Sequence, residues 1–273
     1  MTLILVGTPI GNLEDLSPRA VRTLAEADVV VCEDTRRTGR LLQAAGISAR
    51  KLLAVHDHNE EAQIAPILER LAAGQVVAVV SDAGMPGISD PGELLVRAAA
   101  AAGYEVQVVP GPVAAITGLV ASGLPAGRFV FEGFLPRSGS GRTERLAALA
   151  GERRTILLYE APHRVARTLS DLAGALGGTR RVALARELTK LHEETWRGTL
   201  DESVARCAEV EPRGEYVVVL DGADAPPDAT DAELAAAVAR LLADGLSTRD
   251  AAAEVAATYN VPRRRVYDLA LHP

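Results

Sequence analysis

The sequence predicts an α/β protein with two α/β domains, a mainly parallel sheet followed by a mixed sheet, and a small C-terminal helical module. Three observations support this architecture. Short apolar runs alternate with amphipathic stretches along most of the 273 residues. Aromatic residues make up only 3%, so that Ala, Val and Leu supply most of the apolar content. A Pro-, Ala- and Asp-rich segment at 221–231 then separates a last helical stretch.

The first domain is expected over residues 1–123. Its predicted strands are residues 3–6, 29–32, 52–55, 76–80 and 105–109. One predicted helix begins with Ser17 as N-cap and Pro18 as the first helical residue. The others begin near residue 35, at 59, at Asp90-Pro91 and at 113. Strands that alternate with helices of this length are typical of a parallel sheet with helices on its faces.

The second domain is expected over residues 124–220. Its predicted strands are residues 129–131, 155–159, 181–185, 194–197 and 216–220, and its helices begin near residues 143, 162 and 200. Only a loop joins the strands at 181–185 and 194–197, which predicts a mixed sheet. A linker at 221–231 leads to a helical accessory module at 232–273, with helices expected at 232–243, 248–259 and 262–271.

Composition narrows the possible functions. The formal net charge of −7 argues mildly against a broad electrostatic grip on nucleic acid, although arginines cluster locally. Cys32 and Cys207 are the only cysteines, and they indicate neither a disulfide framework nor a cysteine metal site. His56-Asp57-His58 has no third ligand nearby, so no metal is predicted. No apolar run reaches membrane-spanning length, and we expect a cytoplasmic protein.

Three loops are rich in residues that expose the backbone. They are Gly7-Thr8-Pro9-Ile10-Gly11-Asn12, the stretch SDAGMPGISDPG at 81–92, and Pro110-Gly111-Pro112. In a parallel sheet such loops gather at the carboxyl ends of the strands, where ligands bind. Neither a dinucleotide fingerprint nor a phosphate loop is present. Each loop alone is well explained as a tight turn, but three in one domain favour a ligand. They contain no Lys or Arg, which argues against phosphate.

Eight stretches carry a specific resemblance, and they occur in the order GTPIGNLEDLSPRA, VCEDTRR, VHDHNE, VSDAGMPGISDPG, VVPGP, FEGFLPR, YEAPHR and ARELTK. With them, the chain resembles the small-subunit ribosomal RNA 2′-O-ribose methyltransferases of the tetrapyrrole methylase superfamily, which modify cytidine 1402 of 16S rRNA. The resemblance spans residues 3–220. It implies two α/β domains of the tetrapyrrole-methylase type with S-adenosylmethionine held between them, and a homodimer.

The resemblance also implies a set of cofactor-binding residues. They lie at strand ends of both domains: Pro9, Asp82, Ala83, Gly84, Met85, Val113, Ala114, Tyr159, Glu160 and Ala185. The chain has Ser81-Asp82-Ala83 where the tetrapyrrole enzymes have Gly-Asp-Pro, so the role of Asp82 transfers most directly. Backbone groups and an occasional carboxylate suit a ligand that carries a sulfonium, an ammonium and ribose hydroxyls.

Methyl transfer to a ribose hydroxyl benefits from alignment and from a general base. The candidate bases are Glu33, Asp34, Glu132, Glu160, Glu187, His56, His58 and His163. Glu160 and His163 are the preferred catalytic candidates because they directly follow a predicted strand, and Pro162 starts the next helix. Glu160 is equally well explained as a carboxylate that interacts with the helix dipole.

Basic residues near these loops are the predicted contacts to 16S rRNA in the small subunit. They are Arg36, Arg37, Arg164, Arg186, Lys190 and Arg264. Surface ion pairs explain the loop at 186–190 as well, and the resemblance favours contact with the RNA backbone. The C-terminal stretch resembles a helix-turn-helix with Arg263–Arg265 in its second part; packing against the catalytic domains or a dimer contact explains it equally well.

Two other functions compete with this interpretation. A methyltransferase of the same fold acting on a tetrapyrrole or another small molecule would not need YEAPHR, ARELTK and a basic helical tail. A non-catalytic RNA-binding protein would have no reason to keep three ligand-like turns in one cleft.

Overall fold

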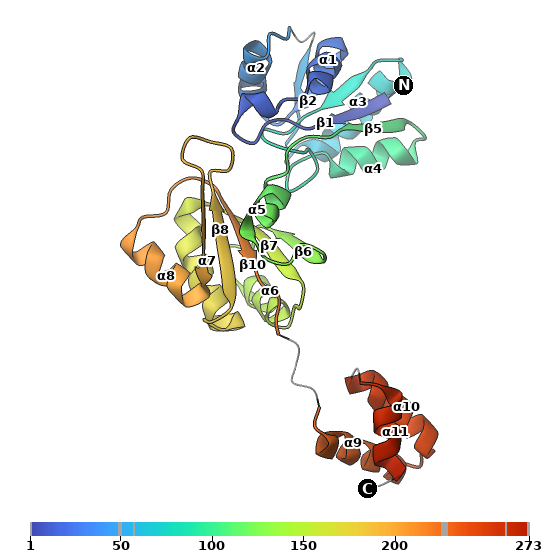
Figure 1. Ribbon diagram of the computed structural model, residues 1–273. Helices are drawn as coiled ribbons and strands as arrows, with labels where there is room; N and C mark the ends of the chain where they lie inside the picture. The colour runs from blue at the N-terminus through green and yellow to red at the C-terminus, as the bar shows by residue number, and fades with distance from the viewer. Residues whose placement is uncertain (1, 49–50, 57, 225–228, 260, 272–273) are drawn as a thin grey trace. The chain divides into compact units, whose positions relative to one another are not determined.

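The computed structural model describes residues 2–48, 51–56, 58–224, 229–259 and 261–271. The chain divides into two compact units, Met1–Ala223 and Asp224–Pro273. The first unit contains two five-stranded sheets and the second contains three helices (Figure 1). The predicted fold class is confirmed. Asp57 of the histidine motif and residues 225–228 of the predicted linker lie outside the described residues.

The first sheet is entirely parallel. Its strands are β1 (Thr2–Val6), β2 (Val29–Cys32), β3 (Leu52–Ala54), β4 (Val77–Val79) and β5 (Glu105–Val109), in the order β3-β2-β4-β1-β5. All four residues of β2 are buried, as expected for a strand that helices cover on both faces. The order makes β4, β1 and β5 direct neighbours. The three glycine- and proline-rich loops therefore leave adjacent strands at one edge of the sheet.

Helices cover both faces of this sheet. They are η1 (Leu13–Asp15), α1 (Pro18–Glu26), α2 (Thr35–Ala44), α3 (Glu60–Ala72) and α4 (Glu93–Ala101). Leu24 of α1 and Leu42 of α2 pack with Val30, whereas residues of α3 and α4 pack with Val31. Because successive side chains of a strand point to opposite faces, these are two separate cores.

The helix expected at Asp90-Pro91 begins instead at Glu93. Gly92 precedes it with φ +129°, and because glycine has no side chain, this N-cap residue cannot accept a hydrogen bond from the first turn. The buried Glu60 carboxylate accepts the backbone N–H groups of Gly92 at 3.0 Å and Leu95 at 3.1 Å. The cap of α4 thus comes from the first turn of α3, which no local pattern around residue 90 could reveal.

The second sheet is mixed, as predicted. Its strands are β6 (Phe129–Gly133), β7 (Thr155–Glu160), β8 (Arg181–Arg186), β9 (Glu194–Thr199) and β10 (Tyr216–Leu220), in the order β6-β7-β10-β8-β9. Only the β6–β7 pair is parallel. One face packs against α6 (Ser140–Ala150), α7 (Pro162–Leu176) and α8 (Leu200–Glu209).

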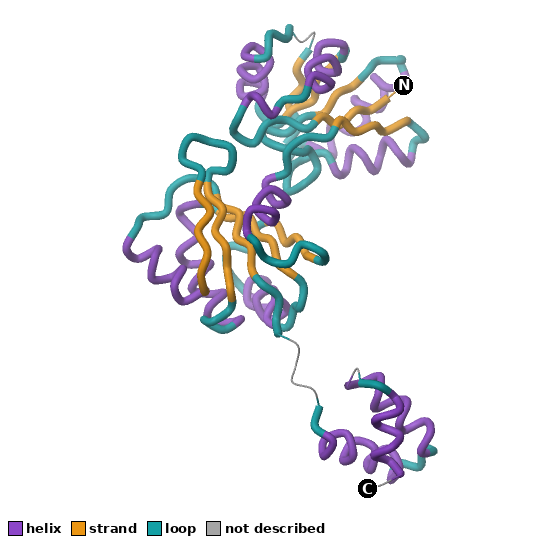
Figure 2. Tube along the Cα trace, in the orientation of Figure 1, coloured by secondary structure: helices purple, strands orange, loops and turns teal. Residues whose placement is uncertain are grey.

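The other face of the second sheet is covered by α5 (Ala114–Ser122), which directly follows the first sheet in the chain (Figure 2). Ala115 and Leu119 of α5 pack on Leu157 and Val217. A Cβ atom on Gly118 would lie 2.8 Å from Val217 Cγ1, so glycine allows this close approach. The helix therefore joins the two sheets, and the division expected between residues 123 and 124 stays a prediction.

The second unit consists of α9 (Asp231–Ala243), α10 (Thr248–Tyr259) and α11 (Arg263–Leu271). Thr230 and Glu233 form a capping box at the start of α9. The core includes Leu234, Val238, Val255 and Val266. A separate small core of this kind is consistent with an accessory module.

Candidate active site

The loops after β1 and β5 touch backbone to backbone. The Gly7 N–H donates to the Val109 carbonyl at 2.9 Å. A Cβ atom on Gly7 would lie 2.6 Å from Gly111 Cα, and one on Gly111 would lie 2.8 Å from Gly7 Cα. Any side chain at either position would collide with main-chain atoms. The glycines are therefore needed for contact between loops.

The loop after β4 joins the same junction. The Thr8 N–H donates to the Gly84 carbonyl at 2.8 Å, and the buried Thr8 hydroxyl approaches the same oxygen at 3.3 Å. Gly84 has φ +83°, a conformation that favours glycine. Three loops of adjacent strands thus form one tight wall of main-chain atoms.

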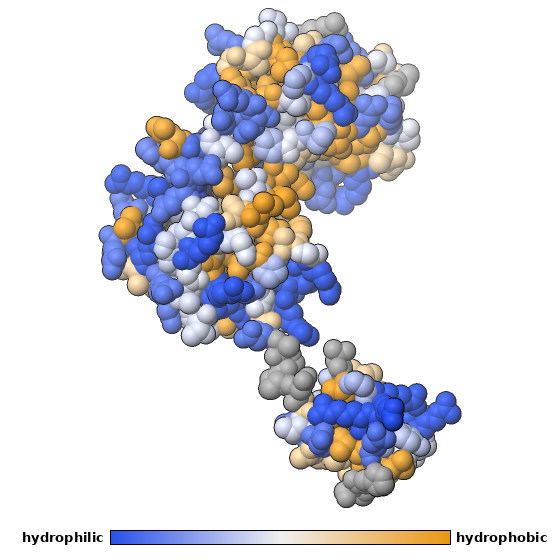
Figure 3. Space-filling view, in the orientation of Figure 1, coloured by the Kyte–Doolittle hydropathy of each residue, from blue (hydrophilic) through white to orange (hydrophobic). Residues whose placement is uncertain are grey.

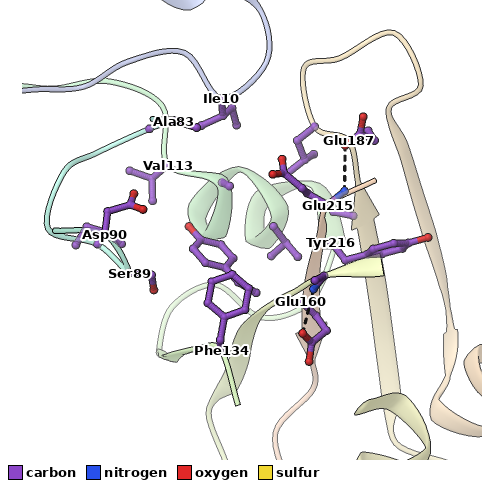
Figure 4. Close-up of a pocket in the computed structure, with 18 of the residues that line it drawn as sticks. Ile10, Ala83, Ser89, Asp90, Val113, Phe134, Glu160, Glu187, Glu215 and Tyr216 are labelled. Atoms are coloured by element: carbon purple, nitrogen blue, oxygen red, sulfur yellow. Dashed lines mark hydrogen bonds between the residues drawn. The ribbon is translucent and has the colours of Figure 1, made fainter. Parts of the chain in front are cut away.

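This wall forms one side of a cavity of about 380 Å³, a size suited to a small-molecule ligand. The opposite side is built from the ends of β7, β8 and β10 in the second sheet and from α7 (Figure 4). Ten predicted site residues line it: Ala83, Gly84, Met85, Val113, Ala114, Tyr159, Glu160, His163, Ala185 and Lys190. The structure thus brings together residues that are far apart in the sequence.

Several lining residues are not among the predicted site residues, including Ile10, Ser89, Asp90, Phe134, Glu215 and Tyr216. Ser89 and Asp90 end the loop after β4, and Phe134 lies in FEGFLPR, so motifs already pointed to these three. Glu215 precedes a plain apolar strand and carries no local signal. Pro9, Asp82, Arg36, Arg37, Arg164, Arg186 and Arg264 are not among the lining residues.

Asp82 lies in a neighbouring open cavity with Asp34, Arg36 and Arg37. One carboxylate oxygen accepts the Asp34 N–H at 3.1 Å, and the other lies 3.3 Å from Arg37 Nη1. Asp34 in turn caps α2 by accepting the Arg36 N–H at 2.7 Å. Asp82 therefore ties the loop after β2 to the loop after β4, and its direct contact with a cofactor stays a prediction.

Tyr159 lines the pocket. Its hydroxyl accepts the Ala115 N–H at 3.1 Å, at the start of α5. Its ring packs edge-on against Phe131, with 5.0 Å between ring centroids. Burial raises the pKa of the Tyr159 hydroxyl. The phenol therefore stays protonated at neutral pH, and its O–H can donate a hydrogen bond but is a poor base.

The Glu160 carboxylate is engaged within the protein. The side chain is fully buried and lies 3.1 Å from Arg164 Nε. It accepts the Thr168 hydroxyl at 2.6 Å and the Ala161 N–H at 3.0 Å. In Figure 4 the carboxylate points away from Ile10 and Ala83. Three donors around one buried carboxylate do not favour a role as general base.

A second charged cluster lines the pocket near the loop after β8. Lys190 Nζ lies 2.8 Å from Glu187 Oε1 and 2.7 Å from Glu215 Oε2. The Glu215 N–H also donates to Glu187 at 3.0 Å (Figure 4). The same loop approaches the loop after β1, because a Cβ atom on Gly11 would collide with the Lys190 side chain. The cluster therefore links the two sheets at the pocket.

The Lys190 hydrogen bond holds the pKa of Glu187 below its ordinary value of 4.5. A carboxyl group whose pKa is lowered by folding stabilises the folded protein at pH values above its ordinary pKa. This contribution is lost as the pH falls through the lowered pKa. We expect Lys190→Met to raise the pH midpoint at which the Glu187 carboxyl-carbon chemical shift titrates in NMR. Lys51→Met, which changes an exposed lysine, is the control. An unchanged midpoint in Lys190→Met would contradict the ion pair.

The remaining predicted RNA ligands differ in exposure. The Arg36 side chain is 91% exposed. Arg186 is half-buried and lies 3.4 Å from Glu194. In the helical unit, Arg264 is exposed, whereas Arg265 lies 2.8 Å from Asp231 and Arg263 donates to the Arg249 carbonyl at 3.0 Å. Their contacts with RNA stay predictions.

Among the residues that the structure describes, no helix combines the length and the apolar character needed to cross a membrane. Nor does the described part of the chain bring together three or more His, Cys, Asp or Glu side chains that could hold a metal ion.

Comparisons with known proteins agree with this architecture. The family described as Tetrapyrrole (Corrin/Porphyrin) Methylases matches residues 2–204, and the RsmI C-terminal HTH domain matches residues 228–272. The chain is similar to a crystal structure of uroporphyrin-III-C-methyltransferase from Thermus thermophilus, with 25% sequence identity and a TM-score of 0.57. The match covers 80% of this chain and 93% of that one. Fold and family match thus define a methyltransferase of the tetrapyrrole methylase class.

Two full-length relatives narrow this class. The ribosomal RNA small subunit methyltransferase I of Synechocystis sp. is 47% identical over 271 residues, which is 98% of this chain and 97% of that protein. The protein of the same name from Xylella fastidiosa is 47% identical over 268 residues, 97% of each chain. The chain belongs to the ribosomal RNA small subunit methyltransferase I family, which confirms the membership that the sequence motifs predict.

Proposed function

We propose that this protein uses S-adenosylmethionine to methylate the 2′-hydroxyl of cytidine 1402 in 16S rRNA, within the small ribosomal subunit. The observation that carries the proposal is the pocket between the two sheets. Residues from the loops after β1 and β4, from the start of α5 and from the second sheet meet there, in a chain that matches small-subunit RNA methyltransferases over nearly its full length. The expected setting is the cytoplasm.

The pocket lining fits a cationic cofactor. Asp90, Glu187 and Glu215 contribute carboxylates, whereas Lys190 is the only Lys or Arg among the lining residues. A negative lining attracts a sulfonium and an ammonium group and disfavours phosphate. Main-chain groups of Ala83, Gly84 and Met85 would hold the polar parts, with Ile10 and Val113 beside the apolar ones. When bound, S-adenosylmethionine supplies a methyl group that is already activated.

The protein's own residues then contribute alignment, exclusion of water and proton handling. The interlocked loops fix one wall, so a bound ribose hydroxyl is held in position without reorganisation of the site. The Tyr159 O–H serves as a hydrogen-bond donor. Of the two predicted bases, His163 fits better, because it is exposed on the first turn of α7 at the pocket, whereas Glu160 is fully engaged.

The homodimer is also proposed, first from the resemblance. Ile116 and Val120 of α5 support it: their exposed fractions are 42% and 74%, and they lie one turn apart. Apolar residues gather on the visible surface in the region of α5 (Figure 3). An exposed apolar helix face of this kind is suited to burial against a second copy.

The experiment that tests the function uses small ribosomal subunits from cells that lack this protein. Purified protein and S-adenosylmethionine are added, and the 16S rRNA is digested and analysed for 2′-O-methylcytidine by mass spectrometry. We expect methylation at cytidine 1402, and calorimetry should show cofactor binding. Methyl incorporation into a porphyrinoid but not into ribosomal RNA would favour a tetrapyrrole substrate instead.

Arg264 offers a test of the helical unit as an RNA contact. Loss of one phosphate contact weakens binding about equally for all sequences and lowers the salt slope of the binding constant by about 1. We expect this change for Arg264→Ala, measured as subunit binding over a salt series. Arg154→Ala, which removes an arginine paired with Glu152 in the first unit, serves as the control. Equal slopes for both variants would contradict the assignment.

A further inference from the structure

Phe134 is a half-exposed aromatic side chain on the wall of the pocket. It has an exposed fraction of 51%, although the chain contains only three phenylalanines. Its ring lies 5.7 Å from the Tyr159 ring, between centroids. Figure 4 shows Phe134 at the opposite end of the pocket from Ile10 and Ala83. A half-exposed ring on the wall of a cavity presents apolar surface that a ligand can cover.

The loop that carries Phe134 is held on both sides. The next residue, Leu135, is buried, and its carbonyl accepts Arg164 Nη2 at 2.6 Å. The Pro136 carbonyl accepts Arg142 Nη1 at 2.8 Å. Before Phe134, Gly133 has φ +59°, and a Cβ atom there would lie 2.9 Å from Ser89 Oγ. Phe134 thus projects from a fixed piece of main chain.

A buried polar network orients the two arginines. Arg164 lies against Glu160, and the Thr168 hydroxyl donates to Glu160 while it accepts Arg142 Nη2 at 3.0 Å. Arg142 also lies 2.8 Å from Asp171 and is only 4% exposed. Glu160 and Arg164 belong to the YEAPHR motif. This network explains the motif as a support for the Phe134 loop.

We propose that Phe134 is a stacking surface for the cytosine base of the target nucleotide, and that Glu160, Arg164, Arg142 and Thr168 are positioning residues that hold it. This inference rests on the proposed function and adds how the nucleotide is held. A ribose that enters the pocket must leave its neighbours in the RNA, so its base loses stacking partners. Aromatic side chains replace such partners with little sequence preference.

The position of Phe134 favours the base of the RNA over the adenine of the cofactor. The main-chain wall proposed for the cofactor includes Ala83, and Phe134 lies at the other end of the pocket (Figure 4). The ring is also half exposed, so that an RNA base can reach it.

The test compares ring with non-ring substitutions. Loss of one stacked base corresponds to about a 5- to 150-fold weakening. We expect Phe134→Leu and Phe134→Ala to lower kcat/KM for small ribosomal subunits within this range, mainly through KM, with unchanged cofactor binding by calorimetry. Phe134→Tyr and Phe134→Trp should retain activity, because each keeps a flat ring. Phe129→Leu, at the start of β6, is the matched control.

Full activity of Phe134→Leu would overturn the stacking role, because leucine fills space without a ring. Weaker cofactor binding with an unchanged KM for subunits would also overturn it, and would assign the ring to the cofactor. If the wild-type protein does not methylate small subunits, the proposed function fails. If the wild-type protein methylates them and the Phe134 variants do so equally well, this inference alone fails.

Thr168→Val tests the positioning network, because it removes the hydroxyl that bridges Glu160 and Arg142 with little change in shape. We expect a higher KM for subunits, unchanged cofactor binding, and recovery in Thr168→Ser. In the Phe134→Ala background the same substitution should have no further effect on kcat/KM. An equal loss in both backgrounds would show that the network acts apart from Phe134.

Discussion

Gly7→Ala is expected to destabilise the first unit and to abolish cofactor binding. The new Cβ atom would lie 2.6 Å from Gly111 Cα and 2.7 Å from Met85 Sδ. The Gly111 main chain cannot yield locally, because it lies two residues after the end of β5 and packs against Gly7 of the β1 loop. Overpacking of this kind costs about 1–3 kcal/mol of unfolding free energy. Separation of the two loops would also move Gly84 and Met85 of the pocket wall.

The measurement is denaturant unfolding followed by the fluorescence of Trp196, the only tryptophan, which lies in β9 of the first unit. Calorimetry reports cofactor binding in parallel. Gly39→Ala is the matched control, because Gly39 lies inside α2 with no atom within 4 Å of its added Cβ. Alanine there should stabilise the helix by about 1 kcal/mol. A gain of stability in both variants would contradict the close contact between the Gly7 and Gly111 loops.

Local patterns were sufficient for most of the fold. Residues 29–32, 105–109 and 216–220 form strands with the predicted bounds, because apolar β-branched runs specify strands locally. Ser17 and Pro18 likewise start α1 as expected. The start of α4 was misplaced because its cap is a carboxylate from α3, which is distant in sequence.

The site was predictable where its residues lie in loops at strand ends or in the motifs that carry the family resemblance. The glycine-rich loops could be found from composition, but their contact depends on β4, β1 and β5 being neighbours in the sheet. Strand order is a property of the whole domain. For the same reason the sequence showed neither the ion pair of Glu215 with Lys190 nor the direction of the Glu160 side chain.

Removal of the Glu160 carboxylate should have the largest effect on stability. Glu160→Ala would leave Arg164, whose side chain is 19% exposed, without its buried carboxylate. It would also remove the acceptor for the Thr168 hydroxyl. Breaking a buried ion pair by deleting one partner costs about 3–5 kcal/mol, because the other charge stays desolvated. Glu160→Gln keeps the shape and one acceptor oxygen, so we expect a smaller loss.

An exposed ion pair provides the comparison. The Glu211 and Arg213 side chains lie 3.0 Å apart and are 77% and 78% exposed. Solvent screens such a pair, so Glu211→Ala should change the unfolding free energy by at most about 1 kcal/mol. Trp196 fluorescence during denaturant unfolding measures both variants in the same unit. Equal losses for Glu160→Ala and Glu211→Ala would mean that water reaches the Glu160 network. The Phe134 loop would then lack the rigid support that its buried arginines provide.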